Sequence, residues 1–417
     1  MFGTNFMLKK TQDISDIFKA EYSNLVAVLC RLFGIDNIQL AEDLISDTFV
    51  QAMKTWSHKG VPDEPKGWLH RVAFNKAKDH FRRNKTYKDK IIPHLLRDTD
   101  KKKNQPFSEE LMADSQLNMF FAVCHSALSP SAQICLALRI LCSFNIEEIA
   151  AALLSNKEAI NKKLFRAKQK LKPFKKEWKN LNPNDYTIRL DNVLRIIYLI
   201  FNEGYYSSIS NENIRQELCW EAMRLCLFLL DQESLPKIKI NALMALMCFH
   251  TSRLNSRVDH AGNFILFDKQ DRSLWNQELI QKGKAYLSRS ADGKIVSNYH
   301  LEAAIAYWHT TDADDKWNNI LQLYNKLLTI AYSPVAAMNR TFALAHANSV
   351  PEAIKEAKKL DLKQNHLYYS LMAELYKMVK NHKEELKFLK LALAHTEKEK
   401  EIKLLNRKIE IASRNKN

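Results

Sequence analysis

Glycine and proline are scarce in this chain of 417 residues, which contains only 8 Gly and 10 Pro. Because both residues mark turns and interrupt regular elements, their scarcity disfavours a fold of many short strands joined by tight turns. Residues that favour helices, such as Leu, Ala, Lys, Glu, Ile and Met, are abundant, and no long alternating strand pattern stands out. The composition predicts an all-α protein of two or three domains.

Long apolar runs are lacking as well. The apolar stretch 193–201 is too short to cross a bilayer and contains Arg195. The N-terminus shows no long apolar segment followed by a small-residue cleavage site. We therefore expect no signal peptide, no membrane contact and a cytoplasmic location.

Cysteine is limited to seven residues, none of which forms a close Cys-x-x-Cys pair. This pattern disfavours a disulfide framework. Cys124-His125 is half of a metal-binding pattern, but no second pair follows at ligand spacing, so a structural metal is the less favoured interpretation. We expect free, mostly buried thiols, no metal, no cofactor and no catalytic residue.

The net charge of +16 lies in two short segments. Residues 59–103 hold 14 Lys and Arg against 6 Asp and Glu, and residues 156–180 hold 10 against 2. The charges of the remaining chain cancel. Two separate basic segments, each beside a helical pattern, indicate two contacts with a nucleic acid more than two solvated faces.

Apolar residues recur at helical spacing in most of the chain. Helices are expected at 13–32, 38–56 and 68–83, then a linker at 84–107 and further helices to residue 171. The last third suggests stacked helix pairs, with small residues in the first helices (Ala304, Ala343, Ala373) and second helices at 317–330, 351–360 and 383–394. An irregular helical bundle remains the alternative.

The second basic segment overlaps a helix-turn-helix pattern at 144–171. Its second helix carries an apolar stripe at spacings of four, three and four, formed by Ile160, Leu164, Ala167 and Leu171. The opposite face is polar and presents Glu158, Lys162, Arg166 and Gln169. This distribution is typical of a helix that lies in the major groove of DNA.

The first basic segment differs, because residues 68–83 alternate aromatic rings with cations. Aromatic rings stack on unpaired bases, which favours a contact with single-stranded DNA. Trp68, Leu69, Val72 and Phe81 also fit the buried face of an amphipathic helix, and that interpretation is the commoner one.

Several stretches resemble the sigma-70 superfamily of bacterial RNA polymerase sigma factors. AEDLISDTFVQA at 41–52 resembles the region 2 helix that docks on the polymerase core, and WLHRVAFNKAKDHFRR at 68–83 resembles the −10 helix. LSP at 128–130, EIA at 148–150 and RAKQKL at 166–171 resemble region 4, which reads the −35 element. Nothing between them resembles region 3, as in the extracytoplasmic-function group.

The remaining chain resembles the subgroup of that family with a fused tetratricopeptide-like C-terminal domain. The matching stretches are LIFNEGY at 199–205, SRVD at 256–259 and FDKQDRSLW at 267–275. The resemblance implies a non-enzymatic factor that binds core polymerase and promoter DNA and directs transcription initiation. The implied domains are region 2 at 12–85, a linker at 86–107, region 4 at 108–172 and the helical-repeat domain at 186–417.

The resemblance also implies roles for the matched residues. The residues expected to contact core polymerase are Asp43, Leu44, Asp47, Phe49 and Gln51. Those expected at the −10 strand are Arg71, Asn75, Lys76, Asp79, Arg82 and Arg83. Those expected at the −35 duplex are Asn156, Lys157, Asn161, Lys162 and Arg166.

Two other classes of function remain open. A helix-turn-helix regulator would use 144–171 alone, without polymerase binding. An RNA-processing enzyme on a helical scaffold lacks support from any nucleophile elbow or glycine-rich phosphate loop. The C-terminal domain is charge-balanced, so we expect it to regulate activity or to bind a regulatory protein. The charged cluster Asp259, Asp268, Asp271 and Arg272 fits an ion-pair network better than a catalytic pocket.

Overall fold

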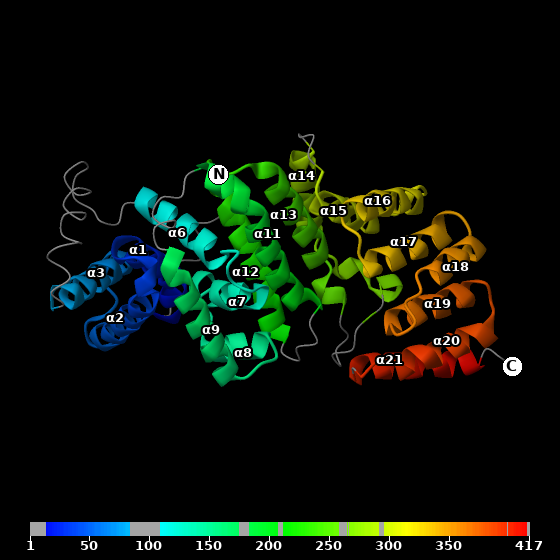
Figure 1. Cartoon of the computed structure of the whole chain (residues 1–417), viewed down its shortest axis with the longest axis horizontal. Helices are drawn as coiled ribbons and strands as arrows, with labels where there is room; N and C mark the ends of the chain where they lie inside the picture. The colour runs from blue at the N-terminus through cyan, green and yellow to red at the C-terminus, as the bar shows by residue number, and fades with distance from the viewer. Residues whose placement is uncertain are drawn as a thin grey trace. The chain divides into compact units, whose positions relative to one another are not determined.

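The computed structural model describes residues 14–83, 109–174, 183–206, 212–257, 265, 267–291, 296–397 and 399–414. Every regular element in these ranges is a helix, which confirms the all-α prediction (Figure 1). No helix there is both long and apolar enough to cross a membrane. The chain divides into two compact units, Met1–Leu235 and Pro236–Asn417, and the predicted linker at 86–107 lies outside the described residues.

The N-terminal unit begins with a bundle of three long helices, all three expected from the apolar spacing. They are α1 (Ile14–Phe33), α2 (Ile38–Lys59) and α3 (Pro65–Arg83), with a short 3-10 turn η1 (Ile35–Asn37) between the first two. Leu25, Ile45 and Leu69 lie fully buried where the three helices meet. The second helix ends at Lys59, and the residue that follows, Gly60, has a φ of 79°, which glycine adopts without steric cost.

A second set of shorter helices follows in the N-terminal unit. It comprises α6 (Glu109–Val123), α7 (Pro130–Leu136), the π-helix η2 (Ala137–Leu141), α8 (Ile146–Ala152), α9 (Lys157–Leu171) and the 3-10 turn η3 (Lys172–Phe174). The predicted stripe of α9 is confirmed as its buried face, because Ile160, Leu164, Ala167 and Leu171 are all at most 3% exposed.

Two further helices, α11 (Pro183–Tyr206) and α12 (Glu212–Asp231), also belong to the N-terminal unit. They pack against each other and against α6, α7 and α8. Arg224 on α12 donates from Nη2 to the carbonyl oxygen of Leu141 at 2.6 Å, at the end of η2. The division into compact units falls after Leu235 because these contacts hold α11 and α12 to the shorter helices, and the domain start at 186 stays a prediction.

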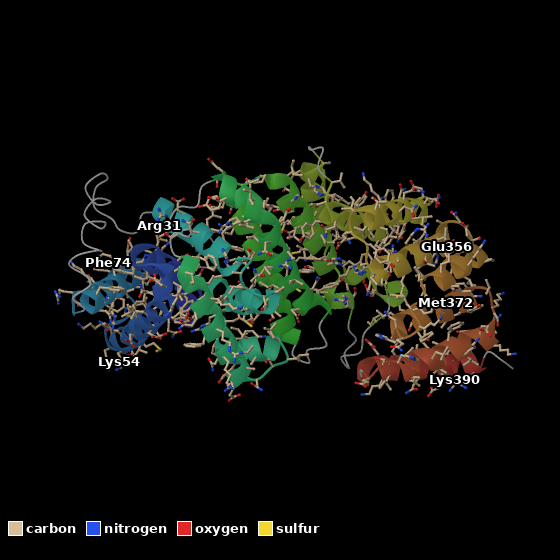
Figure 2. All side chains as sticks on the ribbon, viewed as in Figure 1. Arg31, Lys54, Phe74, Glu356, Met372 and Lys390 are labelled. Atoms are coloured by element: carbon tan, nitrogen blue, oxygen red, sulfur yellow. The ribbon has the colours of Figure 1, made fainter. Side chains whose placement is uncertain are left out.

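The C-terminal unit is a succession of helices in which each packs on its neighbour in sequence. Its helices are α13 (Lys237–Thr251), α14 (Gln277–Ser290), α15 (Asn298–His309), α16 (Lys316–Ile330), α17 (Pro334–Ala347), α18 (Val350–Lys359), α19 (His366–Met378), α20 (His382–Ala394) and α21 (Glu399–Arg414). The second helices expected from the sequence form as α16, α18 and α20. Met372, labelled in Figure 2, lies fully buried in the apolar core of this unit.

Gly283 makes possible the close packing of α14 on α13. A Cβ atom at this position would lie 2.7 Å from Cε1 of Phe249, and Phe249 is itself 1% exposed. We expect Gly283→Ala to lower the free energy of unfolding by about 1–3 kcal/mol, because the aromatic ring must move within a packed core. Urea unfolding measures this change, with Ser288→Ala in the same helix as the control. An unchanged midpoint for Gly283→Ala would contradict the prediction and show that the ring of Phe249 moves without loss of stability.

All seven cysteines are free and buried, as the sequence predicted. Burial raises the pKa of the Cys248 thiol to about 12 and raises those of Cys30 and Cys124 further. Since the thiolate is the reactive form, these side chains act as small apolar residues of the core.

Candidate nucleic-acid interface

Helix α3 separates a buried face from a cationic outer face. Leu69, Ala73 and Ala77 are fully buried at spacings of four, which fixes the helix against the bundle. Of the expected −10 residues, Arg71, Asn75, Asp79 and Arg82 are exposed, and Lys76 is half-buried. The side chain of Arg83 lies outside the described residues. Arg82 Nη2 lies 3.1 Å from Asp79 Oδ1 in an exposed ion pair. Replacing this ion pair by a contact with a phosphate would cost little free energy.

The aromatic residues of α3 pack mainly against other helices of the bundle. The ring of Phe81 stacks on Phe33 with centroids 4.4 Å apart, and Trp68 packs edge-on against Trp56 at 5.3 Å. His70 is buried, and its Nε2 lies 2.9 Å from a carboxylate oxygen of Glu21. The core interpretation therefore fits these rings, while Phe74 in Figure 2 is half-buried.

Helix α2 presents an acidic outer face. Asp43, Asp47 and Gln51 are exposed at spacings of four, and Leu44 is half-buried. Phe49 is 3% exposed and its ring packs on Phe18 with centroids 4.1 Å apart. A side chain so enclosed offers no surface to a partner, so the geometry assigns Phe49 to the core of the bundle.

The outer face of α2 also carries two apolar side chains that sequence reasoning did not assign to a site. Val50 is 44% exposed and Met53 is 50% exposed. The buried residues of α2 follow the phase of Ile38, Ala41, Ile45, Ala52 and Trp56, and Met53 lies outside this phase. Exposed apolar side chains beside carboxylates are typical of a protein-binding face.

Helix α9 begins with a well-formed N-cap. The side chain of Asn156 accepts from the backbone N–H of Ala159 at 2.8 Å, and Asn145 forms a capping box with Glu148 at the start of α8. Lys157 pairs with Glu147 of α8. Both side chains of this ion pair are exposed, so Lys157 can leave Glu147 and contact an external ligand at a small cost in free energy.

All five residues expected at the −35 duplex lie exposed on α9 or its cap: Asn156, Lys157, Asn161, Lys162 and Arg166. Phe165, which the sequence did not single out, is 62% exposed beside Arg166. Because Phe165 lies outside the apolar stripe of this helix, the sequence pattern could have predicted its exposure. The outer face of α9 thus combines cations, an amide and an aromatic ring.

The turn between α8 and α9 contains backbone strain. Leu154 has φ of 48°, in the left-handed region, and its side chain is 68% exposed. Leu154→Gly should therefore raise the free energy of unfolding by about 0.5–1 kcal/mol, since the strain is relieved and no packing is lost. Thermal or urea unfolding checks this against Ser155→Gly; a lower stability of the Leu154 variant contradicts the expectation.

A buried carboxylate links α2 to the shorter helices. Glu42 is 3% exposed and accepts hydrogen bonds from the Tyr22 hydroxyl at 2.8 Å and from Arg139 Nε at 2.9 Å. Lys168 of α9 donates to the same carboxylate and to Gln39 Oε1 at 2.8 Å. Burial, followed by the charge of Glu42, raises the pKa of Tyr22 well above its usual range.

The charged cluster expected in the C-terminal unit is only partly described. Asp259 and the side chain of Asp268 lie outside the described residues. Asp271 caps the 3-10 turn η6 (Arg272–Leu274) by accepting from the backbone N–H of Ser273 at 2.9 Å, and Arg272 pairs with Asp312. Within the described ranges, no group of three or more His, Cys, Asp and Glu is arranged to hold a metal ion.

Comparison with known proteins finds two families within the chain. Residues 17–87 match sigma-70 region 2, and residues 189–291 match a family of unknown function, DUF6596. The chain is 29% identical over 353 residues to the uncharacterized protein R00370 of Rhizobium meliloti (strain 1021), with 82% of each chain covered. It is also 28% identical over 130 residues to the ECF RNA polymerase sigma factor BldN of Streptomyces coelicolor (strain ATCC BAA-471 / A3(2) / M145), covering 30% of this chain and 47% of that protein.

No solved structure matches the chain. The first family match extends over nearly all of α1 and the whole of α2 and α3, and so includes both candidate outer faces. The second extends from within α11 to the end of α14 and includes the stretches 199–205, 256–259 and 267–275.

Proposed function

We propose that this chain, which carries a sigma-70 region 2 domain, is a sigma factor of the extracytoplasmic-function type that directs promoter-specific transcription initiation. The single observation that carries the proposal is that the matched helices leave two polar faces exposed. The acidic face of α2 suits a protein partner, the core polymerase, and the cationic face of α3 suits the −10 strand.

Helix α9 would read the −35 duplex from the major groove. Asn161 has the amide that pairs with the edge of an adenine, and Arg166 has the guanidinium that pairs with a guanine. Lys157 and Lys162 would contact phosphates, and exposed Phe165 offers apolar contact to a thymine methyl group. Such phosphate contacts give affinity that falls steeply with salt.

Transcription in vitro with purified core polymerase tests the proposal. We expect the chain to start RNA synthesis at a promoter selected from random DNA by the reconstituted holoenzyme. The control is Lys170→Ala, an exposed cation near the C-terminal end of α9 that is not among the residues expected at the −35 duplex. Asn161→Ala and Arg166→Ala should reduce initiation at that promoter while Lys170→Ala does not.

The same assay distinguishes a sigma factor from the alternative function, a helix-turn-helix regulator. A regulator binds promoter DNA without core polymerase and adds nothing when core polymerase is the only other protein present. DNA binding by the chain alone, combined with no initiation by the chain and core, would favour the regulator over the sigma factor.

The C-terminal unit would regulate this activity or bind a partner protein through stacked, tetratricopeptide-like helix pairs. A chain ending at Leu235 is the sharpest test, because α11 and α12 contact the shorter helices and an earlier cut would remove them. Higher initiation by the shortened chain means inhibition by the C-terminal unit, and loss of initiation means that this unit is required. Unchanged initiation contradicts both roles.

A further inference from the structure

Three cations of the C-terminal unit lie against two aromatic rings. Cζ of Arg253, just after α13, lies 4.8 Å from the ring centroid of Phe267 and 5.8 Å from that of Trp275. Arg272 lies over the ring of Trp275 at 5.2 Å, and Nζ of Lys316, the first residue of α16, is 5.8 Å from the centroid of Phe267. The two rings are themselves 5.9 Å apart. These five residues form a cation–aromatic cluster.

Lys316 is the most enclosed cation of the cluster. The residue is 8% exposed, and its Nζ donates to the carbonyl oxygen of Thr311 at 3.2 Å, which uses one of its three N–H groups. Burial, followed by the charge of Arg272, lowers the pKa of Lys316 below its usual range. Because enclosing a cation among other cations costs free energy, an anion that binds there is favoured.

Two ring nitrogens at the cluster are buried and have no hydrogen-bond partner within the described residues. They are Nε1 of Trp275 and Nδ1 of His309. The His309 ring lies against those of Phe267 and Trp317, with centroids 5.1 and 5.8 Å away. Burial lowers the pKa of His309 to about 3, so its ring is neutral at pH 7. Since a neutral imidazole carries one N–H and indole carries another, both rings have a donor to offer to a bound group.

The carboxylate of Asp312 offsets part of this positive charge. It pairs with Arg272, and its charge opposes the lowering of the pKa of Lys316, so it acts on both cations. The Asp312 side chain is 78% exposed, and exposed ion pairs contribute little stability. Asp314 and Asp315 in the same turn are also exposed and form no ion pair among the described residues. An external anion can therefore displace Asp312 at small cost.

We propose that the cation–aromatic cluster binds a small molecule with a terminal phosphate, free or as a monoester, which takes the place of the Asp312 carboxylate beside Arg272 and Lys316. A phosphate group carries about 1.5 to 2 negative charges at pH 7, and so matches several cations better than one carboxylate does. Its oxygens accept hydrogen bonds from guanidinium and ammonium groups. Lys316 is too enclosed for the backbone of a nucleic acid to reach it.

Isothermal titration calorimetry of the full chain with inorganic phosphate tests the site, with chloride holding the ionic strength constant. We expect saturable binding that Lys316→Met weakens at least tenfold, because the enclosed ammonium is lost while the volume of the side chain is kept. Lys326→Met, at an exposed position of the same helix, is the matched control and should bind as the unaltered chain does. Acetate should bind at least tenfold more weakly than phosphate, since it carries a single charge.

Glycerol phosphate, titrated in the same way, distinguishes a monoester from the free ion. Whichever of the two binds more tightly is the ligand form that the site prefers, and Lys316→Met should weaken both.

Asp312→Asn should have the opposite effect. This variant removes the competing carboxylate and keeps its size, so the affinity for phosphate should rise several-fold. Asp314→Asn, with the same chemical change at a neighbouring exposed position, should alter the affinity little. Thermal unfolding shows whether each variant is folded.

Four results would overturn the site: no saturable binding of phosphate, equal affinities of the Lys316 and Lys326 variants, acetate binding as tightly as phosphate, or equal affinities of the Asp312 and Asp314 variants. The last comparison decides the question even if Lys316→Met does not fold. The inference goes beyond the proposed function, because these titrations contain neither polymerase nor DNA. Loss of transcription initiation would contradict the proposed function and leave the phosphate affinity unchanged.

Discussion

Glu42→Gln is expected to lower the free energy of unfolding of the N-terminal unit by about 3–5 kcal/mol, among the largest effects of any single substitution in this chain. The carboxylate is 3% exposed and faces Arg139 and Lys168 at hydrogen-bond distance. Its neutral amide keeps the size and leaves two enclosed cations without an anion. Urea unfolding followed by the helical signal measures the loss.

Asp43→Asn is the control for this experiment, because it makes the same chemical change one residue away at an exposed position. We expect it to change the unfolding midpoint little. If Glu42→Gln changed the unfolding midpoint as little as the control does, Arg139 and Lys168 would have to find other hydrogen-bond partners. The ion-pair network around Glu42 would then contribute little to the stability of the fold. A double variant with Lys168→Met should recover part of the loss, since one of the unpaired cations is then absent.

Much of the fold follows from local sequence pattern. The apolar stripe of α9 fixes its buried face, and the helices α16, α18 and α20 form close to the segments expected from periodicity. These predictions succeed because helix formation and burial of one face depend on residues three and four positions apart. The exposed faces of α2 and α9 follow in the same way.

The seam between α2 and α9 was not predictable from the sequence. Glu42 and Lys168 are 126 positions apart, and a glutamate in an amphipathic helix is ordinarily exposed. The division of the chain after Leu235 depends likewise on long-range contacts of α11 and α12. Phe49, expected to contact core polymerase, is enclosed, and Met53 is exposed, because the rotation of a helix within its bundle decides which side chains at the edge of the apolar stripe are buried.

The last prediction concerns the acidic face of α2. Asp47 is exposed and forms no hydrogen bond or ion pair among the described residues, so its charge is free for an external partner. We expect Asp47→Lys to weaken the binding of core polymerase by about 100-fold, because a like-charge contact in an interface costs several kcal/mol. The fold should be unaffected, since lysine is a good helix former on an exposed face.

Asp63→Lys is the matched control, because it reverses a charge at an exposed position of the turn before α3. Affinity for fluorescently labelled core polymerase separates the two variants, and the unfolding midpoint confirms that each is folded. The long-range part of the interaction should weaken in high salt for the unaltered chain, as expected for charges at an accessible rim. Equal affinities of the Asp47 and Asp63 variants would mean that the polymerase contacts another face, and that the exposed Val50 and Met53 beside Asp47 do not mark its binding site.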